Sequence, residues 1–400
     1  PGDARRADRL ERPLLQPGRG PVRALVEARR PGGRDGGCGA VHRRRVARRA
    51  GRLPADRERH RRRGRVQAHL RRRAARGGRP HDEGRARDGN CRREALTPTV
   101  FLVNPASANG STGRRWPEIA RQAAARGLTG EALVSEAPGH LGELAVVAVE
   151  GGAEVLVVVG GDGSVHETVN GLVAAGRSLD AELAVFPRGT GKDFVRSLRI
   201  PKDLGGAIEV ARNGHARTID VGHARFHACD GSAAEAYFAN FAGAGISGAI
   251  ARRANASSKA AGGRVSFLWA TVAVFARWQS ASVTATIGET RRSGQVFEVL
   301  AMNGDYAAGG MWVTPDAVPD DGLLDVLVIG DVTKADFVRT FPKIYRGRHL
   351  SHPKIDVLRG AAVEVDADRP LPIVLDGEQP GTTPARFEIV QGALKVRVPA

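Results

Sequence analysis

The stretch "VLVVVGGDGSVHETVNGL", residues 155–172, constrains the fold of this chain more than any other. Its first five residues are apolar and mostly β-branched, as in a strand buried on both faces of a parallel sheet. After the glycines, apolar residues recur at the spacing of an amphipathic helix. Ser164 and Glu167 have the spacing of a capping box, so we expect this helix to begin at Ser164. The stretch predicts a strand, a tight turn and a helix N-terminus.

The turn itself, residues 160–163, indicates a phosphate site. Helix N-termini present unpaired backbone N–H groups, and glycines let a bulky anion approach them. A plain strand-to-helix turn is the weaker alternative, because it rarely needs more than one glycine. Asp162 in the middle of the turn would repel a phosphate unless Mg²⁺ lay between them. The turn therefore favours a nucleotide bound with a metal ion.

The surrounding sequence repeats this alternation of strands and helices. Strands are expected at 97–105, 131–136 and 155–159 and in the stretch that begins at Ala181, with helices at 117–126, 139–150 and 165–175. This order predicts an α/β fold, a doubly wound parallel sheet that binds its ligand at the carboxyl ends of the strands. Asn104 and the glycine turns at 160–163 and 189–191 fall at such ends.

Beyond about Thr218 the sequence changes to short strands with alternating polarity, and only 249–277 and 333–347 have a helical pattern. We expect an ATP-binding domain at 97–218 and a mainly antiparallel β domain at 219–400. The last strands are candidates to return to the first domain. Ligand sites prefer the clefts between domains, so the active site is expected in the interdomain cleft.

The net charge of +18 is confined to the first quarter of the chain. Residues 1–96 hold 30 Arg and 11 acidic residues and lack eight residue types, including Lys, Ser and Ile, whereas the remainder holds 31 basic and 32 acidic residues. Such a segment buries too little apolar surface to fold, so we expect disorder. Its composition is typical of translated GC-rich DNA upstream of a true start; an Arg-rich arm for nucleic acid or anionic lipid is the alternative.

The remaining composition favours a cytoplasmic protein. Cys38, Cys91 and Cys229 form no paired motif, which argues against disulfide frameworks and zinc sites. The longest uncharged apolar stretch, 265–276, is too short to span a bilayer. Beside it lies a basic run, Arg252, Arg253, Lys259 and Arg264, so peripheral contact with a membrane surface is an open alternative to a solvated helix end.

Two glycine patterns are poor matches to known nucleotide motifs. Residues 243–248 spell G-x-G-x-x-G, but no acidic residue occurs between Glu235 and Glu289 to hold a dinucleotide ribose. "GTGKDF" at 189–194 fails the P-loop pattern because Asp193 follows Lys192. The acidic cluster around Asp321 is either a plain turn or a Mg²⁺ site.

Five stretches, in their order along residues 97–398, resemble the motifs of the diacylglycerol kinase catalytic-domain family. They are "VNPASANG", "GGDGSVHETVNGL", "PRGTGKDFVR", "TPDAVPDDGLL" and the late "DGE". The resemblance implies ATP and Mg²⁺ as cofactors. It implies Glu378 as the general base, Asp162 as the second catalytic residue, and Asp321 with the carbonyls of Val318 and Leu323 as a magnesium site. The implied ATP-binding residues are Asn104, Ser135, Gly160, Gly161, Asp162, Gly163, Ser164, Val165, His166 and Thr190.

Three positions depart from the family's motifs. Lys192 stands in place of the usual Asn and brings a cation that could meet phosphate. Ser164 replaces the commoner Thr, and "GAGISGA" at 243–249 lacks the family's acidic residue, which leaves the contacts to the acceptor open.

The resemblance implies a lipid kinase that transfers the γ-phosphoryl group of ATP to a hydroxyl of a membrane lipid, with diacylglycerol as the expected acceptor. An NAD kinase is the rival enzyme. The alternative outside enzymes is a non-catalytic protein that binds nucleotide or nucleic acid. The near-zero net charge of residues 97–400 argues against nucleic acid as a partner. The sequence leaves the oligomeric state and the identity of the lipid open.

Overall fold

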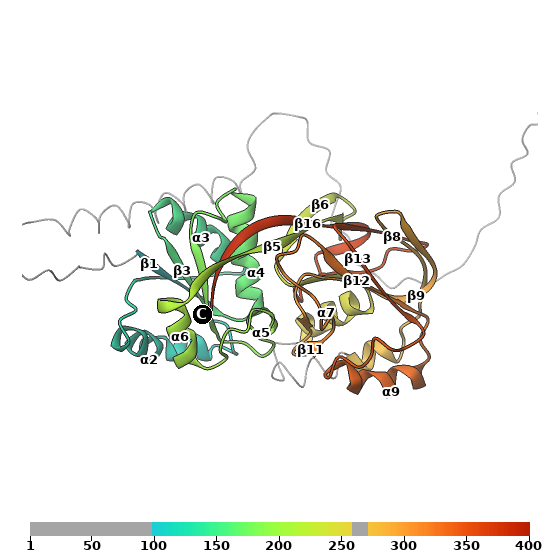
Figure 1. Ribbon diagram of the computed structural model, residues 1–400, viewed down its shortest axis with the longest axis horizontal. Helices are drawn as coiled ribbons and strands as arrows, with labels where there is room; N and C mark the ends of the chain where they lie inside the picture. Colours follow the sequence, from blue (N-terminus) through green and yellow to red (C-terminus); the bar gives the residue numbers. More distant parts are fainter. Residues whose placement is uncertain (1–97, 258–270) are drawn as a thin grey trace, which may run out of the picture. The chain divides into compact units, whose positions relative to one another are not determined.

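The computed structural model describes residues 98–257 and 271–400 (Figure 1). The described residues leave out the Arg-rich segment 1–96, Lys259, Arg264 and the first half, 265–270, of the apolar stretch at 265–276. The expectations placed on these residues lie outside the described part of the chain. Within the described residues, no helix is long and apolar enough to cross a bilayer.

The first part of the described chain, residues 98–214 and here called the α/β half, is built on four parallel strands in the order β2-β1-β3-β4. All six residues of β3 are buried, as expected for a central strand covered on both faces. The elements are β1 (Thr99–Val103), α2 (Ser111–Ala125), β2 (Glu131–Val134), α3 (His140–Glu150), β3 (Val155–Gly160), α4 (Asp162–Ala174), β4 (Glu182–Pro187), α5 (Asp193–Ser197) and α6 (Leu204–Asn213).

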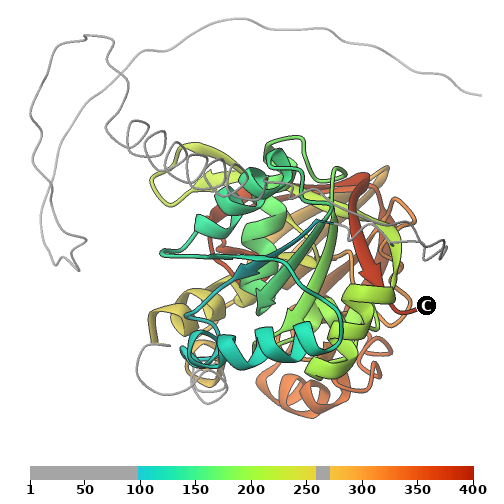
Figure 2. The same ribbon diagram turned by 90° about the vertical axis from the view of Figure 1, so that its left-hand side faces the viewer.

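Alternate residues of β3 pack on opposite faces of this sheet. Val157 and Val159 belong to one core with Ile119 of α2 and Ile208 of α6. Leu156 and Val158 belong to a second core with α3 and α4. Figure 2 shows the strands between these two helical layers. The predicted doubly wound sheet is therefore confirmed.

The second part, residues 215–400 and here called the β half, is mainly antiparallel. Its helices include α7 (Ile246–Ser257) and α9 (Lys334–Ile344). Its strands are β5 (His215–Ala228), β6 (Ala233–Phe238), β7 (Phe241–Gly245), β8 (Ala281–Ile287), β9 (Thr290–Met302), β10 (Tyr306–Ala307), β11 (Met311–Trp312), β12 (Leu324–Gly330), β13 (Ile355–Gly360), β14 (Ala362–Ala367), β15 (Ile373–Leu375) and β16 (Gly381–Val398).

Two long strands join the halves. β5 and β16 pair antiparallel along most of their length and run from one half to the other (Figure 1). β16 pairs with β14 of the β half and, at Val396, with β4 of the α/β half. The two halves are thus parts of one hydrogen-bonded sheet.

Two helix starts differ from the sequence expectation. α2 begins at Ser111, six residues before Pro117, and carries this proline in its interior. The missing N–H of Pro117 made the first helical position the natural choice from sequence. α4 begins at Asp162 and not at Ser164, with Gly161 as an N-cap in extended conformation and no side chain capping the helix. The predicted capping box is therefore wrong.

Candidate active site

The glycine turn places a helix N-terminus at the carboxyl ends of β3 and β4. A Cβ added to Gly161 would lie 3.2 Å from Cα of Gly189, so the two glycine loops pack backbone to backbone. A Cβ on Gly163 would meet nothing within 4 Å. The turn is therefore close-packed on one side and open on the other, as a phosphate cradle requires.

Ser164 connects this turn to β1 and does not cap α4. Its buried hydroxyl accepts a hydrogen bond from Asn104 Nδ2 at 2.9 Å. The Asn104 backbone N–H donates to the carbonyl of Val159 at 3.1 Å. Because the helix has already begun at Asp162, the hydroxyl of Ser164 is free to hold the ends of β1 and β3 together.

Basic side chains gather beside the turn. The Arg188 backbone N–H donates to the Gly160 carbonyl at 2.7 Å. Burial, together with the positive charge of Arg115, lowers the pKa of Arg188. Burial, Arg188 and Lys202 likewise lower the pKa of Lys192, whose ammonium donates to the Lys202 carbonyl at 2.9 Å. Arg188, Lys192 and Lys202 form no ion pair within the described residues. A triphosphate would neutralise this cluster.

Two carboxylates face the same glycine of the second loop. A Cβ on Gly191 would lie 2.6 Å from Asp162 Oδ2 and 3.4 Å from Asp193 Oδ2. Burial raises the pKa of Asp162, and burial with the charge of Asp162 raises the pKa of Asp193 to about 6. Asp193 Oδ1 is buried without a hydrogen-bond partner among the described residues. Paired carboxylates with an unsatisfied oxygen fit a divalent cation that arrives with a nucleotide.

Asp376 ties the β half to α4. Its carboxylate accepts hydrogen bonds from the backbone N–H groups of Ala239, Asn240 and Phe241 at 2.8–3.0 Å. His166 Nδ1 lies 3.2 Å from the same carboxylate. Burial alone would lower the pKa of His166, but the hydrogen bond and charge of Asp376, with the charge of Glu378, raise it. An aspartate before glycine is expected to bond its own turn, whereas Asp376 bonds a segment distant in sequence.

Glu378 projects from a tight turn at the end of β15. The backbone groups of Leu375 and Glu378 exchange two hydrogen bonds of 2.9 Å around Asp376 and Gly377, both of which have positive φ. This is the geometry of a hairpin turn that favours Asp-Gly. Glu378 is exposed and accepts a hydrogen bond from Asn255 of α7 at 3.1 Å. Partial desolvation of its carboxyl raises the pKa of Glu378, while His166 opposes the shift.

A cavity of about 700 Å³ extends from the glycine loops into the β half. At its polar end lie Asp162, Thr190, Asp193 and Asp376. Most of its wall is apolar and comes from α7, the β7–β9 sheet and α9. Representative lining residues are Ile250, Phe297, Leu300, Met311, Phe337 and Phe341. The cavity thus joins a polar, acidic end to a long apolar interior.

The structure brings most of the predicted nucleotide residues to one edge of the sheet. Ser135 follows β2, and its N–H donates to the Val103 carbonyl at 2.9 Å. Asp162, Val165 and Thr190 line the cavity itself. His166 faces Asp376 and does not line the cavity. The assignment of ATP contacts to single residues stays a prediction.

The residues predicted to bind magnesium lie elsewhere. Neither Asp321 nor Val318 nor Leu323 lines the cavity. Asp321 forms an ion pair with Arg359 and accepts the Leu323 N–H at 3.0 Å. Across residues 98–257 and 271–400, no three His, Cys, Asp or Glu side chains cluster as a metal site. A cation at Asp321 would compete with Arg359 for the carboxylate, and this magnesium site stays a prediction.

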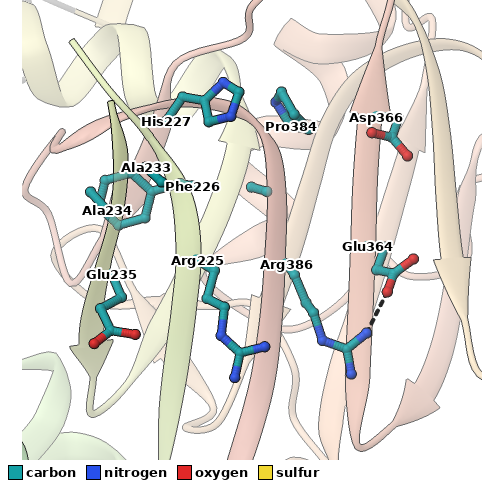
Figure 3. Close-up of a pocket in the computed structure, with 11 residues that line it drawn as sticks. Arg225, Phe226, His227, Ala233, Ala234, Glu235, Glu364, Asp366, Pro384 and Arg386 are labelled. Atoms are coloured by element: carbon teal, nitrogen blue, oxygen red, sulfur yellow. Dashed lines mark hydrogen bonds and ion pairs between the residues drawn. The ribbon is translucent and has the colours of Figure 1, made fainter. Parts of the chain in front are cut away.

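A second hollow, of about 640 Å³, lies over the strands that join the halves (Figure 3). Arg225 and Arg386 stand side by side on β5 and β16 and share Glu388 at 2.8–2.9 Å. Arg386 also pairs with Glu364. The charges in this second hollow are therefore largely neutralised within the sheet, and none of the predicted site residues lines it. The first cavity is the candidate active site.

The sequence analysis missed several side chains of the candidate site. Asp193 was quoted within "GTGKDF" but given no role, although both glycine loops end in an Asp that begins a helix. Lys192 was noted as a cation that could meet phosphate, but Arg188 and Lys202 were not linked to it. The apolar cavity carried no local signal, since its lining residues come from separate helices, loops and strands.

Two domain models match the chain in succession. Residues 98–224 match a diacylglycerol kinase catalytic domain. Residues 240–398 match the YegS C-terminal NAD kinase beta sandwich-like domain. Residues 98–224 therefore carry a diacylglycerol kinase catalytic domain. The predicted resemblance to this family is confirmed, and it supports a kinase.

Curated relatives and solved structures agree with this assignment. The diacylglycerol kinases of Staphylococcus carnosus and Staphylococcus epidermidis are 25% identical over 299 residues, which is 75% of this chain and 94% and 91% of those proteins. A putative diacylglycerol kinase from Bacillus anthracis str. Sterne has a TM-score of 0.61 at 22% identity, covering 76% of this chain and 98% of that one. This likeness supports the fold.

Proposed function

We propose that the protein transfers the γ-phosphoryl group of ATP to a hydroxyl of a membrane lipid, with diacylglycerol as the acceptor and phosphatidic acid as the product. The observation that carries the proposal is the cavity, because its acidic end meets the glycine loops and its apolar interior suits acyl chains. The relatives named diacylglycerol kinase support the choice of acceptor.

The glycine turn and the basic residues beside it support a binding position for the nucleotide. The N-terminus of α4 and the Arg188–Lys202 cluster would hold the phosphates, and Asp162 with Asp193 would hold Mg²⁺. A bound Mg²⁺ supplies charge neutralisation on the transferred group. Asn104 and Ser135, at the ends of β1 and β2, are in place to contact the nucleotide, as their positions in the family motifs imply.

Glu378 is the proposed general base. As the lipid oxygen bonds to the γ-phosphorus, the bond to the bridging oxygen of ADP breaks, and the hydroxyl proton passes to the Glu378 carboxylate. Partial desolvation raises its pKa and so favours proton uptake. Asp376 is less suited to this role, because three backbone N–H groups and His166 already occupy its carboxylate.

The test is phosphorylation by the full-length protein with radiolabelled ATP and Mg²⁺, using diacylglycerol in mixed micelles, a sphingoid base or NAD as acceptor. Label in phosphatidic acid is the expected result, and label only in NADP would support the NAD kinase alternative. Asp162→Ala should lower turnover at least about a hundredfold without unfolding the protein, because it removes a carboxylate that organises the metal nucleotide. Unchanged turnover in Asp162→Ala would place the site elsewhere.

A further inference from the structure

The outer face of α9 combines exposed apolar and basic side chains next to the cavity. The inner face of α9, formed by Phe337, Phe341 and Ile344, lines the cavity. The outer face exposes Val338, at 65% of its surface, and Tyr345, which directly follows the helix and lines the rim of the cavity, is exposed to 48%. These are large apolar side chains that a helix facing only water does not need.

The same region carries an excess of positive charge. Residues 337–355 contain five basic residues and no acidic one. Arg339 and Lys343, at i and i+4 of α9, and Arg346, in the turn that follows the helix, are exposed. Within the described residues, none of these three forms an ion pair. Arg252 and Arg253 of α7, the helix on another wall of the cavity, are exposed as well.

We propose that the outer face of α9 docks on an anionic lipid bilayer and seats the apolar cavity at the membrane surface. An amphipathic helix with basic and apolar residues on its free side lies in the interface of such a bilayer, with the apolar residues below the headgroups. Val338 and Tyr345 enter the interface, and Arg339, Lys343 and Arg346 contact the anionic headgroups.

The docking explains how an acceptor reaches the cavity. One helix supplies both surfaces: its outer face rests on lipid, and its inner aromatic residues form the cavity wall. A lipid leaving the bilayer beside α9 therefore passes along apolar side chains. The role of the surface in substrate delivery rests on the proposed lipid kinase function, whereas docking itself does not.

The test measures the environment of α9 itself and not vesicle binding by the whole protein, because the Arg-rich segment 1–96 can also attract anionic vesicles. Val338→Cys, in a chain whose three native cysteines are replaced by Ser, is labelled with an environment-sensitive fluorophore. The matched control is Val134→Cys, an apolar residue of the α/β half exposed to 44%. Vesicles are phosphatidylcholine with or without phosphatidylglycerol, and both contain a lipid with a quencher in its acyl chain.

We expect the label at position 338, but not at position 134, to shift to the blue and to be quenched on phosphatidylglycerol vesicles. Adding Arg339→Gln, Lys343→Gln and Arg346→Gln should weaken this signal about a hundredfold in lipid concentration. The same number of neutralised basic residues in the α/β half, Arg121→Gln, Arg126→Gln and Arg212→Gln, should leave it unchanged.

Equal signals at positions 338 and 134, or a signal unaffected by the α9 substitutions, would overturn the docking proposal. Phosphorylation of a short-chain diacylglycerol in non-ionic micelles keeps the two proposals apart. The α9 variant should retain this micellar activity. If the native protein lacks it while α9 still inserts, the proposed kinase function fails and the docking surface stands.

Discussion

Individual carboxylates in this protein have sharply different surroundings. Asp376 is bound by three backbone N–H groups and a histidine, Glu378 by a single amide, and Glu298 by Ser247 within the cavity wall. A carboxylate that accepts many hydrogen bonds holds structure together, and one with few is free to take a proton. The acid/base assignment therefore depends on these partners.

Separate substitutions at Glu378 and Asp376 test this assignment. Glu378→Gln should lower kcat about a hundredfold while ATP affinity and the free energy of unfolding stay unchanged, because only proton uptake is lost. Asp376→Asn should lower the free energy of unfolding by about 2 kcal/mol, since a charged acceptor is lost. Radiometric assays, calorimetric ATP binding and urea unfolding measure the three quantities. A normal kcat in Glu378→Gln with a collapse in Asp376→Asn would exchange the two roles.

Glu298 predicts a pH-dependent stability. Burial raises its pKa from 4.5 to about 7, although Ser247 donates to both carboxylate oxygens. Between these two values the folded state holds the proton more tightly than the unfolded state, so this group's contribution to stability falls as pH rises, by about 3 kcal/mol in total. In urea unfolding at pH 5 and pH 8, Glu298→Gln should lose less stability than the native protein.

The exposed Glu289 is the control for this measurement. Glu289→Gln should follow the native pH dependence. A native-like dependence in Glu298→Gln would mean that other groups cause it.

At the scale of elements, the sequence predicted the α/β half well. Apolar runs such as 155–159 favour buried strands, because β-branched side chains pack well in a strand that is covered on both faces. Helix starts were predicted poorly, because tertiary contacts determine the backbone conformation around Gly161 and Pro117, and the local sequence pattern does not encode these contacts. The pairing of β16 with β4 and the approach of Asp376 to α4 depend on residues far apart in sequence.

The position of the α4 N-terminus depends on close packing of α3 and α4. A Cβ on Gly171 would lie 2.4 Å from Cα of Gly142, so the two helices touch through their backbones. Gly171→Ala should therefore lower the free energy of unfolding by about 1–3 kcal/mol through overpacking. Gly205→Ala in α6, where the nearest atom is 3.4 Å from the added Cβ, should stabilise the protein slightly. Urea unfolding of both variants checks the difference, and equal effects would contradict the packing argument.

At the scale of the whole molecule, the two halves divide the proposed reaction between them. The α/β half supplies the glycine loops, and the β half supplies Glu378 and the apolar wall of the cavity. β5, β16 and the Asp376–His166 contact hold these parts in register. Positioning is the main requirement of phosphoryl transfer, so joining the halves in one sheet serves the chemistry directly.

This division predicts that filling the apolar interior will change the lipid and not the nucleotide. Ala254 of α7 lines the cavity and is half-buried, so Ala254→Phe inserts a ring into space that an acyl chain would occupy. KM for a long-chain diacylglycerol should rise about tenfold or more, while a short-chain acceptor and ATP keep their native KM. Ala124→Phe, on the exposed side of α2, adds the same ring outside the cavity and away from α9, and is the control. If Ala254→Phe raised KM equally for long and short acceptors, the apolar interior would not be the acyl-chain site, and the lipid would have to approach Glu378 from another side.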